Sequence, residues 1–508
     1  MKNIIIEKYN DIKIGGLYGS SASLFITNVL EKYKNILVIL NNNTEINNLS
    51  KELRCFVKED ININKFYDYD KLPYEEIDND IELLSERLKT YHNLIKNSFN
   101  LTLSCYSALS KNIPPEHEII KYFSIIDKST KYNNLINIIK QMDYNRTFEV
   151  KEKGEYRIQG SIIDIFSLIE NYPYRIVYDN DQIISIKRID LNTQKSQQSI
   201  DSFILSNTKE IQLSKENLTN YKKNCKKLFD TDYVNDLEYE KVINKIYHPN
   251  LYNLLPLFYK EKSDIFDLMY KQNFTIITSK PLLSEFNKYR LFFDEYYEKI
   301  KYEKNILESS NILVTDKKIK TVINDFNKIE ITSLKIHEDR KCYNMNINKL
   351  PSVIINNTFK DPFSNLEKFL RNTTYKVLLC IGRKSLQNEL LKILKKYNIA
   401  CKLIDSYYNF RQHREKICLL NKSINEGFID NELKLAVISE KDIFGYRSIT
   451  TPHTSTRRNL LDDYINNISS LQLNDAIVHD NYGVGRYKGL INMDIEGRVT
   501  ELIKIEYA

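Results

Sequence analysis

The sequence predicts a multidomain protein of the α/β class. At 508 residues the chain is too long for a single hydrophobic core and is expected to divide into about three to five domains. In residues 1–116 and 341–465, apolar runs typical of buried strands alternate with segments of helical periodicity, which indicates parallel sheets covered by helices. Between them, residues 154–190 alternate apolar and polar side chains with a period of two, which indicates an antiparallel sheet.

The bulk composition is that of an ordinary globular protein. Hydrophobic residues make up 42% and charged residues 28% of the chain, as is usual for soluble domains. The net charge of +7, from 74 basic and 67 acidic residues, is too small over this length to indicate nucleic-acid binding by itself. The seven cysteines form no Cys-x-x-Cys pair, and neither a signal peptide nor an apolar run of the roughly 18–20 residues that span a bilayer is found. We therefore expect a cytoplasmic protein without a zinc site, a disulfide framework or a membrane contact.

The first segment, residues 1–116, is expected to form an α/β domain. Its predicted elements are a loop of small residues at 15–19, helices at 23–33 and 81–95, and apolar strands at 36–40 and 101–106. A loop of small residues ahead of a helix is where a nucleotide-binding fold holds phosphate. This loop is therefore the first candidate binding site.

The loop lacks the residues that hold a nucleotide. A working phosphate loop reads Gly-x-x-x-x-Gly-Lys-Ser/Thr, because the lysine neutralises the phosphates and the hydroxyl holds magnesium. From Gly19 this chain reads GSSASLFI, so that Ser23 is followed by Leu24, Phe25 and Ile26 in place of the glycine, the lysine and the hydroxyl residue. We expect a degenerate loop that does not bind ATP. We interpret it as a plain helix start.

The stretch 154–190 is the most regular part of the chain. We expect three short antiparallel strands, separated by turn residues at Gly160, 171–173 and 179–181. The apolar side chains that alternate along them are Tyr156, Ile158, Tyr174, Ile176, Tyr178, Ile184 and Ile186. One face of this sheet should pack on a core, and the other should expose Arg, Gln, Ser and Lys. Such a sheet offers a docking surface rather than a catalytic cleft.

This stretch also resembles a known family. Its segments GEYRIQG, IDIF, PYRI and IISIKRID resemble the small domain that the transcription-repair coupling factors share with the excision-repair subunit UvrB. The segments LPYE at 72–75, SERL at 85–88 and LPLFY at 255–259 are similar to the α/β domain around it. The resemblance implies that residues 213–340 return to complete this first domain. An unrelated antiparallel meander is the alternative for 154–190.

The resemblance implies that the exposed face of this sheet binds UvrA. The family has an arginine before the glycine ahead of the IDIF strand, where this chain has Gln159, and keeps the arginine of its Pro-Tyr-Arg motif as Arg175. Arginine suits an interface because it forms charge-assisted, bidentate bonds to carboxylates. Arg157 lies two residues from Gln159 and could replace the lost charge. The expected UvrA-binding residues are therefore Arg175, Arg157, Gln159 and Tyr178. The alternative for Arg175 is a solvated strand arginine.

Residues 341–465 read as a small α/β scaffold domain. Its predicted elements are strands at 376–381, 400–404 and 435–438 and a helix at 385–397. The segment ISEKDIFG at 438–445 resembles the end of the third domain of the coupling factors. A linker at 450–458 and a helix at 460–469 are expected to follow.

The last segment resembles a domain that contacts RNA polymerase. LNDAIVHDNYGVGRYKGL at 473–490 is similar to the start of the CarD-like RNA-polymerase-interacting domain, a small barrel of the SH3/Tudor type. Gly483 and Gly485 would allow a tight strand bend. The resemblance implies a contact with the polymerase β subunit by strand addition or an apolar edge. Met493 and Ile495 are the candidate contact residues.

Together these features predict the adaptor half of a coupling factor. The expected domains are 1–116 and 213–340 (two parts of a UvrB-like α/β domain with a degenerate phosphate loop), 117–212 (an inserted antiparallel α+β sheet domain that binds UvrA), 341–465 (the scaffold) and 466–508 (a partial CarD-like barrel). By resemblance, the intact protein is an ATP-driven DNA translocase that displaces stalled RNA polymerase and recruits UvrA. The motor domains, which would bring ATP, magnesium and most DNA contact, have no motif in this sequence, so we expect a fragment or a broken gene without a catalytic residue or cofactor of its own.

Three points stay open at this level. A UvrB-like excision-repair subunit is one alternative function, and a CarD-like transcription regulator with an unrelated amino-terminal region is another. The sequence does not decide whether the UvrA surface is exposed or masked. We expect a monomer.

Overall fold

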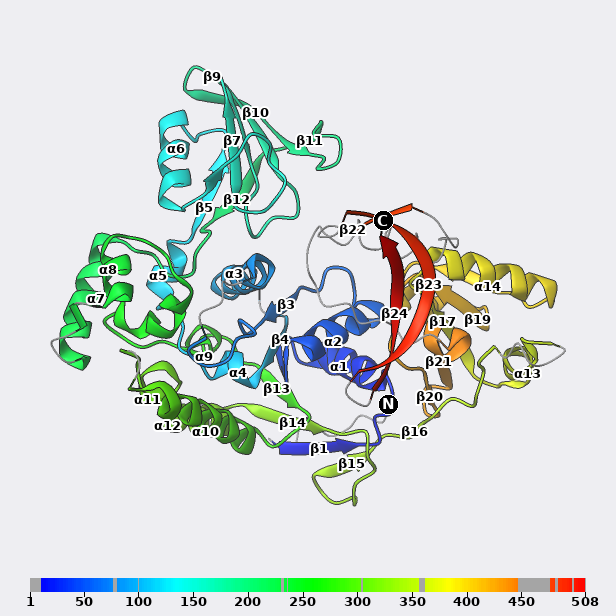
Figure 1. Ribbon diagram of the computed structural model, residues 1–508. Coiled ribbons are helices and arrows are strands. Elements are labelled where there is room, and N and C mark those ends of the chain that lie inside the picture. The colour runs from blue at the N-terminus through cyan, green and yellow to red at the C-terminus, as the bar shows by residue number, and fades with distance from the viewer. Residues whose placement is uncertain are drawn as a thin grey trace. The chain divides into compact units, whose positions relative to one another are not determined.

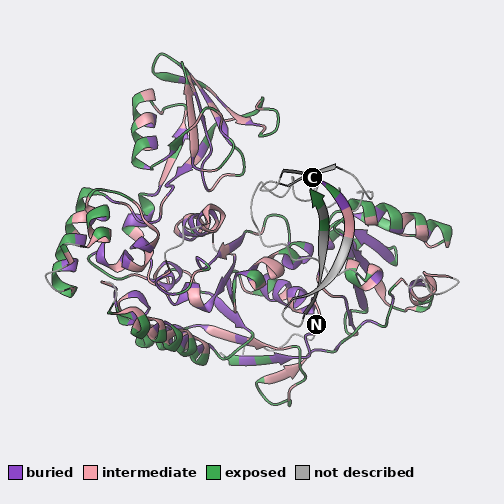
Figure 2. Cartoon of the chain, in the orientation of Figure 1, coloured by how far each residue is buried: buried purple, intermediate pink, exposed green. Residues whose placement is uncertain are grey.

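The structure is a computed structural model that describes residues 11–75, 80–98, 100–229, 233–234, 236–302, 305–355, 361–445, 476–479, 483–495 and 498–507 (Figure 1). The chain divides into two compact units, Met1–Thr450 and Thr451–Ala508. Within the described ranges, no helix is both long enough and apolar enough to cross a bilayer. Buried residues are concentrated in the strands and in the helix faces that cover them (Figure 2).

The first unit contains a seven-stranded parallel sheet with the order β15-β1-β14-β13-β2-β4-β3. Its strands are β1 (Asp11–Gly15), β2 (Ile36–Leu40), β3 (Ile63–Phe66), β4 (Leu101–Cys105), β13 (Thr275–Thr278), β14 (Asn327–Ile331) and β15 (Cys342–Asn344). Strand β2 reads ILVIL and is buried along almost its whole length, as is usual for parallel strands covered on both faces. The strands predicted at 36–40 and 101–106 are confirmed as β2 and β4.

Helices α1 (Ser21–Lys32), α2 (Asn43–Phe56) and α3 (Ile81–Ile95) pack against this sheet. The side chain of Asn42 accepts a hydrogen bond from the amide of Glu45 at the start of α2. The side chain of Asp80 does the same for the amide of Glu82 at the start of α3. Each cap satisfies an amide that has no partner within the helix. The helices predicted at 23–33 and 81–95 are confirmed, with α1 beginning two residues earlier.

The chain leaves this sheet after β4 and returns to it more than 150 residues later. Strand β13 pairs with β2, and β14 lies between β13 and β1. The return implied by the family resemblance is therefore present, although β15 lies just beyond the predicted boundary at 340. The helices of this first region and of the returning segment are α4 (Tyr106–Leu109), α5 (Glu116–Ile120), α7 (Lys215–Leu228), α8 (Leu237–Ile243), η3 (Pro249–Leu257), α9 (Ile265–Met269), α10 (Leu282–Ile300), α11 (Ser309–Ile312) and α12 (Asp316–Asp325).

The inserted region forms a six-stranded sheet with the order β11-β10-β9-β8-β7-β6. Its strands are β6 (Asn145–Arg146), β7 (Glu155–Gln159), β8 (Ile162–Ile165), β9 (Tyr174–Asp179), β10 (Gln182–Ile189) and β11 (Ser196–Ile200). All neighbours are antiparallel except β6 and β7. Helix α6 (Tyr132–Gln141) and the two-stranded antiparallel sheet of β5 (Phe123–Asp127) with β12 (Ser202–Ser206) share one core with the six-stranded sheet (Figure 1).

Two details of this sheet differ from the prediction. The segment 162–165 forms a fourth strand, β8, between β7 and β9, where only three strands were expected. The register of β10 against β9 also shifts between Ile183 and Ser185. This bulge turns Ile183 and Ile186 toward the core and leaves Ile184 exposed, because an extra residue reverses the alternation of side chains.

A third sheet has the order β16-β20-β21-β17-β19-β18. Its strands are β16 (Ile347–Asn348), β17 (Lys376–Cys380), β18 (Lys402–Ile404), β19 (Ile417–Leu420), β20 (Phe428–Asp430) and β21 (Leu435–Ser439), and its helices are α13 (Ser364–Asn372), α14 (Lys384–Lys396), α15 (Tyr407–Gln412) and α16 (Glu440–Phe444). Strands β18, β19, β17 and β21 are parallel. The predicted elements at 376–381, 385–397, 400–404 and 435–438 are confirmed.

The second unit contains an antiparallel sheet of β22 (Ala476–His479), β23 (Gly483–Ile495) and β24 (Arg498–Tyr507). The Tyr487 side chain on β23 is buried. The predicted linker at 450–458 and helix at 460–469 lie outside the described residues. The SH3/Tudor-like barrel remains an expectation, since the described strands form one three-stranded sheet.

Candidate functional site

The two faces of the six-stranded sheet have opposite character. The covered face carries the buried side chains that pack against α6 and the β5–β12 pair, among them Ile163, Ile165, Tyr174, Ile176 and Ile186. The other face is formed by the alternate residues of the same strands, which are polar at most positions. We call this second face the open face. It consists of Arg157, Gln159, Ile162, Asp164, Arg175, Val177, Ser185, Lys187 and Ser199.

A row of charges crosses the open face. The strand register places Arg157 opposite Asp164, Asp164 opposite Arg175, and Arg175 opposite Lys187. Side chains directly opposite each other on one face of antiparallel strands lie within contact distance. The row therefore contains three cations and one carboxylate, and it is basic overall.

Arg175 is held inside this row by Asp164. Its Nε donates to Asp164 Oδ1 at 2.8 Å, and its Nη2 donates to Asp164 Oδ2 at 2.9 Å. The hydrogen bonds to Asp164 raise the pKa of the Arg175 guanidinium. The Asp164 side chain is only 4% exposed, against 23% for Arg175, so Arg175 compensates a buried carboxylate. The bidentate hydrogen bonds that Arg175 was expected to form with a partner's carboxylate are therefore formed within the sheet, to Asp164.

Arg157 and Gln159 are more available to a partner. Both lie on β7, Gln159 is exposed and Arg157 is partly exposed. The Arg157 Nη2 donates to the Gln159 side-chain oxygen, so the glutamine that replaces the family's arginine positions its neighbour. Ile162 and Val177, half-buried beside them in the register, add an apolar patch that sequence reasoning missed. Val177 lies two residues after Arg175 on β9, and this alternation is the signal that could have identified it.

Tyr178 lies on the other side of the sheet. It is 3% exposed, and its ring packs edge-on against Tyr132 of α6 with centroids 5.2 Å apart. Its hydroxyl donates to the backbone oxygen of Thr130. The structure therefore corrects its assignment as a contact residue, because its alternation with Tyr174 and Ile176 turns it into the core.

The degenerate loop begins α1. Gly19 has a φ of +57°, and Phe25 and Ile26 are buried in the core at 1% and 0% exposure. The two apolar residues that replace the lysine and the hydroxyl residue thus point away from the place where phosphate would lie. Ser23 Oγ donates instead to the carboxylate of Glu52 at 2.6 Å.

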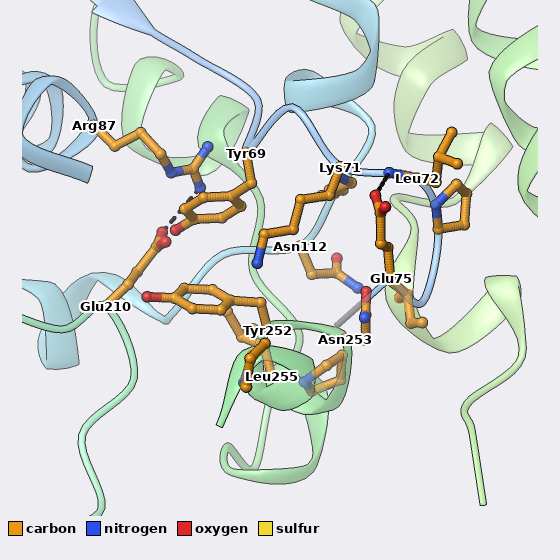
Figure 3. Close-up of a pocket in the computed structure, with 15 residues that line it drawn as sticks. Tyr69, Lys71, Leu72, Glu75, Arg87, Asn112, Glu210, Tyr252, Asn253 and Leu255 are labelled. Atoms are coloured by element: carbon orange, nitrogen blue, oxygen red, sulfur yellow. Dashed lines mark hydrogen bonds and ion pairs between the residues drawn. The ribbon is translucent and has the colours of Figure 1, made fainter. Parts of the chain in front are cut away.

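The SERL segment contributes a buried ion pair (Figure 3). Arg87 Nη2 lies 2.9 Å from Glu210 Oε1, and both side chains are almost fully buried. The guanidinium also donates to the backbone oxygen of Tyr67 and lies over the rings of Phe66 and Tyr69. Burial raises the pKa of Glu210 to about 8. The pair joins α3 to the end of the inserted region, so this family-like segment has a structural role.

A cavity of about 40 Å³ lies beside this pair, lined among others by Tyr69, Lys71 and Tyr252 (Figure 3). It has room for a few water molecules but not for a nucleotide. Among the residues that the structure describes, no cluster of three His, Cys, Asp or Glu side chains could hold a metal ion.

The candidates in the second unit are only partly described. Met493 and Ile495 lie on β23, where they pair with Thr500 and Arg498 of β24. Their side chains, like that of His479, lie outside the described residues.

The fold and the open face define a class of protein, an assembly of α/β domains with an antiparallel sheet that is packed on one face and open on the other. Three family models match the chain in sequence order. Residues 126–210 match the UvrB interaction domain, residues 369–443 match the MFD D3 domain, and residues 471–508 match the CarD-like/TRCF RID domain.

Curated relatives agree with these models. A transcription-repair-coupling factor of Haemophilus influenzae is 23% identical over 98% of this chain and 44% of its own length. Those of Rickettsia prowazekii and Escherichia coli are 25% and 20% identical over 93% and 97% of this chain. The chain thus spans less than half the length of these relatives. The three models and these relatives support the amino-terminal portion of a transcription-repair-coupling factor.

Proposed function

We propose that this chain is the adaptor portion of a coupling factor, which recruits UvrA through the open face of its six-stranded sheet. The observation that carries this proposal is that one face of the sheet is packed while the other exposes a basic row and an apolar patch. Polar and apolar groups of this kind, side by side, are usual for a protein–protein interface.

Within this face, Arg157 and Gln159 make the direct contacts, with Lys187 extending the row. Arg175 contributes by holding Asp164 and the strand geometry. Because the row is basic, it fits an acidic surface on the partner. Its exposed cations would raise the association rate and make it sensitive to salt.

The other end of the chain contacts RNA polymerase. The support is the match of residues 471–508 to the CarD-like/TRCF RID domain. Strand addition to the β subunit would use β22–β24, with Met493 and Ile495 as contact residues. The intact protein would be the ATP-dependent translocase that displaces a stalled polymerase, with ATP and magnesium bound by motor domains.

The degenerate loop does not bind ATP in this proposal. Phe25 and Ile26 are committed to the core, and Ser23 donates to Glu52 rather than facing a free site. A nucleotide would need a lysine and a hydroxyl residue there.

The test is a titration of purified UvrA into the chain and two single variants. Arg157→Ala removes a partly exposed cation of the open face, and Arg414→Ala removes an exposed arginine far along the chain as a control. A charged hydrogen bond contributes about 1.5–3 kcal/mol, so Arg157→Ala should weaken binding about tenfold or more. Arg414→Ala should bind like the wild type. Absence of UvrA binding to the folded wild-type chain would contradict the proposal.

A further inference from the structure

The loop between β19 and β20, residues 421–427, lies against the degenerate loop of the first sheet. We call these residues the docking loop. The amide of Ser20 donates to the backbone oxygen of Glu426 at 3.0 Å, and the amide of Glu426 donates to Ser20 Oγ at 3.2 Å. The Tyr18 hydroxyl donates to Glu426 Oε1 at 2.5 Å. Two segments more than 400 residues apart therefore bond to each other through backbone and side chains.

A buried carboxylate joins the same two segments. Glu52 of α2 accepts hydrogen bonds from Ser20 Oγ at 2.9 Å and from Ser23 Oγ at 2.6 Å. Its Oε1 also accepts the amide of Asn425 in the docking loop at 3.2 Å. The carboxyl group thus lies at the amino-terminal turn of α1, where a nucleotide-binding fold places phosphate.

Gly19 is required by this contact. A Cβ atom at Gly19 would lie 2.8 Å from the backbone oxygen of Gly427 and 3.0 Å from that of Glu426. These are backbone atoms, which cannot move aside as the end of a flexible side chain can. In a working phosphate loop, a glycine lets the backbone approach the nucleotide closely. In this chain, Gly19 lets the docking loop approach closely instead.

Contacts on either side widen the interface. Cys55 Sγ donates to the backbone oxygen of Ser423 at 3.2 Å, and Lys422 Nζ donates to that of Arg54 at 2.8 Å. The ring of Phe56 packs edge-on against Tyr407 of α15, with centroids 5.3 Å apart. The carboxyl-terminal end of α2 is therefore bound to the third sheet as well.

We infer that the former phosphate loop is a docking site whose occupant is the docking loop of the same chain, with the Glu52 carboxylate in place of a phosphate group. The site holds the first and third sheets together as one body. It does not depend on which protein binds the open face.

Hydrogen exchange at single amides tests this inference. The amides of Ser20, Asn425 and Glu426 bond across the interface, whereas the amide of Gly427 bonds to Asp442 Oδ2 within the third sheet's own region. In the full chain, Glu52→Ala should speed exchange at the first three amides by about tenfold or more and leave Gly427 unchanged. Glu59→Ala, at an exposed acid just after α2, should change none of them.

A glycine pair provides a second, independent comparison. Gly19 and Gly160 both have positive φ, at +57° and +61°, but a Cβ at Gly160 would meet nothing within 4 Å. Both Gly19→Ala and Gly160→Ala therefore place a side chain on a residue with positive φ, at a similar cost in backbone strain. Only Gly19→Ala should speed amide hydrogen exchange at Asn425 and Glu426.

Two results would overturn the inference. One is unchanged exchange at the three reporter amides in both Glu52→Ala and Gly19→Ala. The other is an equal loss of protection at Gly427, because the third sheet would then be opening as a whole rather than separating from its docking site.

Discussion

At the scale of single residues, the role of Arg175 follows partly from the family resemblance and partly from the geometry of the sheet. The Pro-Tyr-Arg motif identifies the position of Arg175. Only the structure shows that both carboxylate oxygens of Asp164, on the neighbouring strand, accept hydrogen bonds from its guanidinium. No local pattern couples residues 164 and 175 before the strand register is known. Tyr178 is the opposite case, because the alternation along its strand already placed it with Tyr174 and Ile176 in the core.

The Arg175–Asp164 pair predicts a difference in stability between two arginines of one face. Arg175→Ala leaves a buried carboxylate without its partner and should lower the free energy of unfolding by about 1–3 kcal/mol. Arg157→Ala removes a hydrogen bond to the exposed Gln159 and should stay within about 0.5 kcal/mol of the wild type. Urea denaturation of the inserted region measures both. Equal stabilities for the two variants would contradict the role assigned to Arg175.

Glu52 predicts a pH dependence of stability. Burial raises the pKa of Glu52 above its ordinary value of 4.5, so the folded chain binds this proton more tightly than the unfolded chain. Its contribution is fully present below pH 4.5 and is lost as the pH rises toward the folded pKa. Glu52→Gln should therefore flatten the decline of the unfolding free energy as the pH rises above 4.5. Glu59→Gln is the control, and a slope for Glu52→Gln equal to that of the wild type would refute this assignment.

At the scale of elements, apolar runs and helical periodicity were sufficient to predict the positions of several strands and helices. Strands β2, β4 and β17 and helices α1, α3 and α14 lie close to their predicted positions, because each is defined by its own local pattern. Strand β8 was missed because Ile162 and Ile163 are consecutive apolar residues that break the alternation. The bulge in β10 was missed because it depends on pairing with β9.

Helix α1 predicts the outcome of restoring the lost lysine. Phe25→Lys would place a charge where the side chain is 1% exposed and would remove an aromatic side chain from the core. The expected loss of stability is about 3–5 kcal/mol, as for a buried Phe→Ala change. Thermal unfolding with and without magnesium ATP should show a lower midpoint and no nucleotide-dependent rise. A rise specific to this variant would contradict the account of the degenerate loop.

At the scale of the whole chain, the sequence predicted the order of the family-like regions but not the contacts between distant segments. The three family-like regions follow one another as expected. The contact between residues 19–26 and 421–427 could not be predicted, because it joins backbone groups more than 400 residues apart without any residue pattern that marks them as partners. The same applies to the ion pair of Arg87 with Glu210.

The central claim is that the open face of the six-stranded sheet is the docking surface for UvrA. Its most direct test compares two charge reversals within the inserted region. Arg157→Glu with Lys187→Glu changes the open face, and Lys128→Glu with Lys140→Glu changes exposed lysines near the start and the end of α6, which packs on the covered face. The net charge changes equally in both.

In a titration of UvrA, the open-face double variant should lose about a hundredfold or more in affinity, as expected for two charged contacts of about 1.5 kcal/mol or more each. The α6 double variant should retain the wild-type affinity. Equal affinity of the two double variants would contradict the assignment of the docking surface to this face.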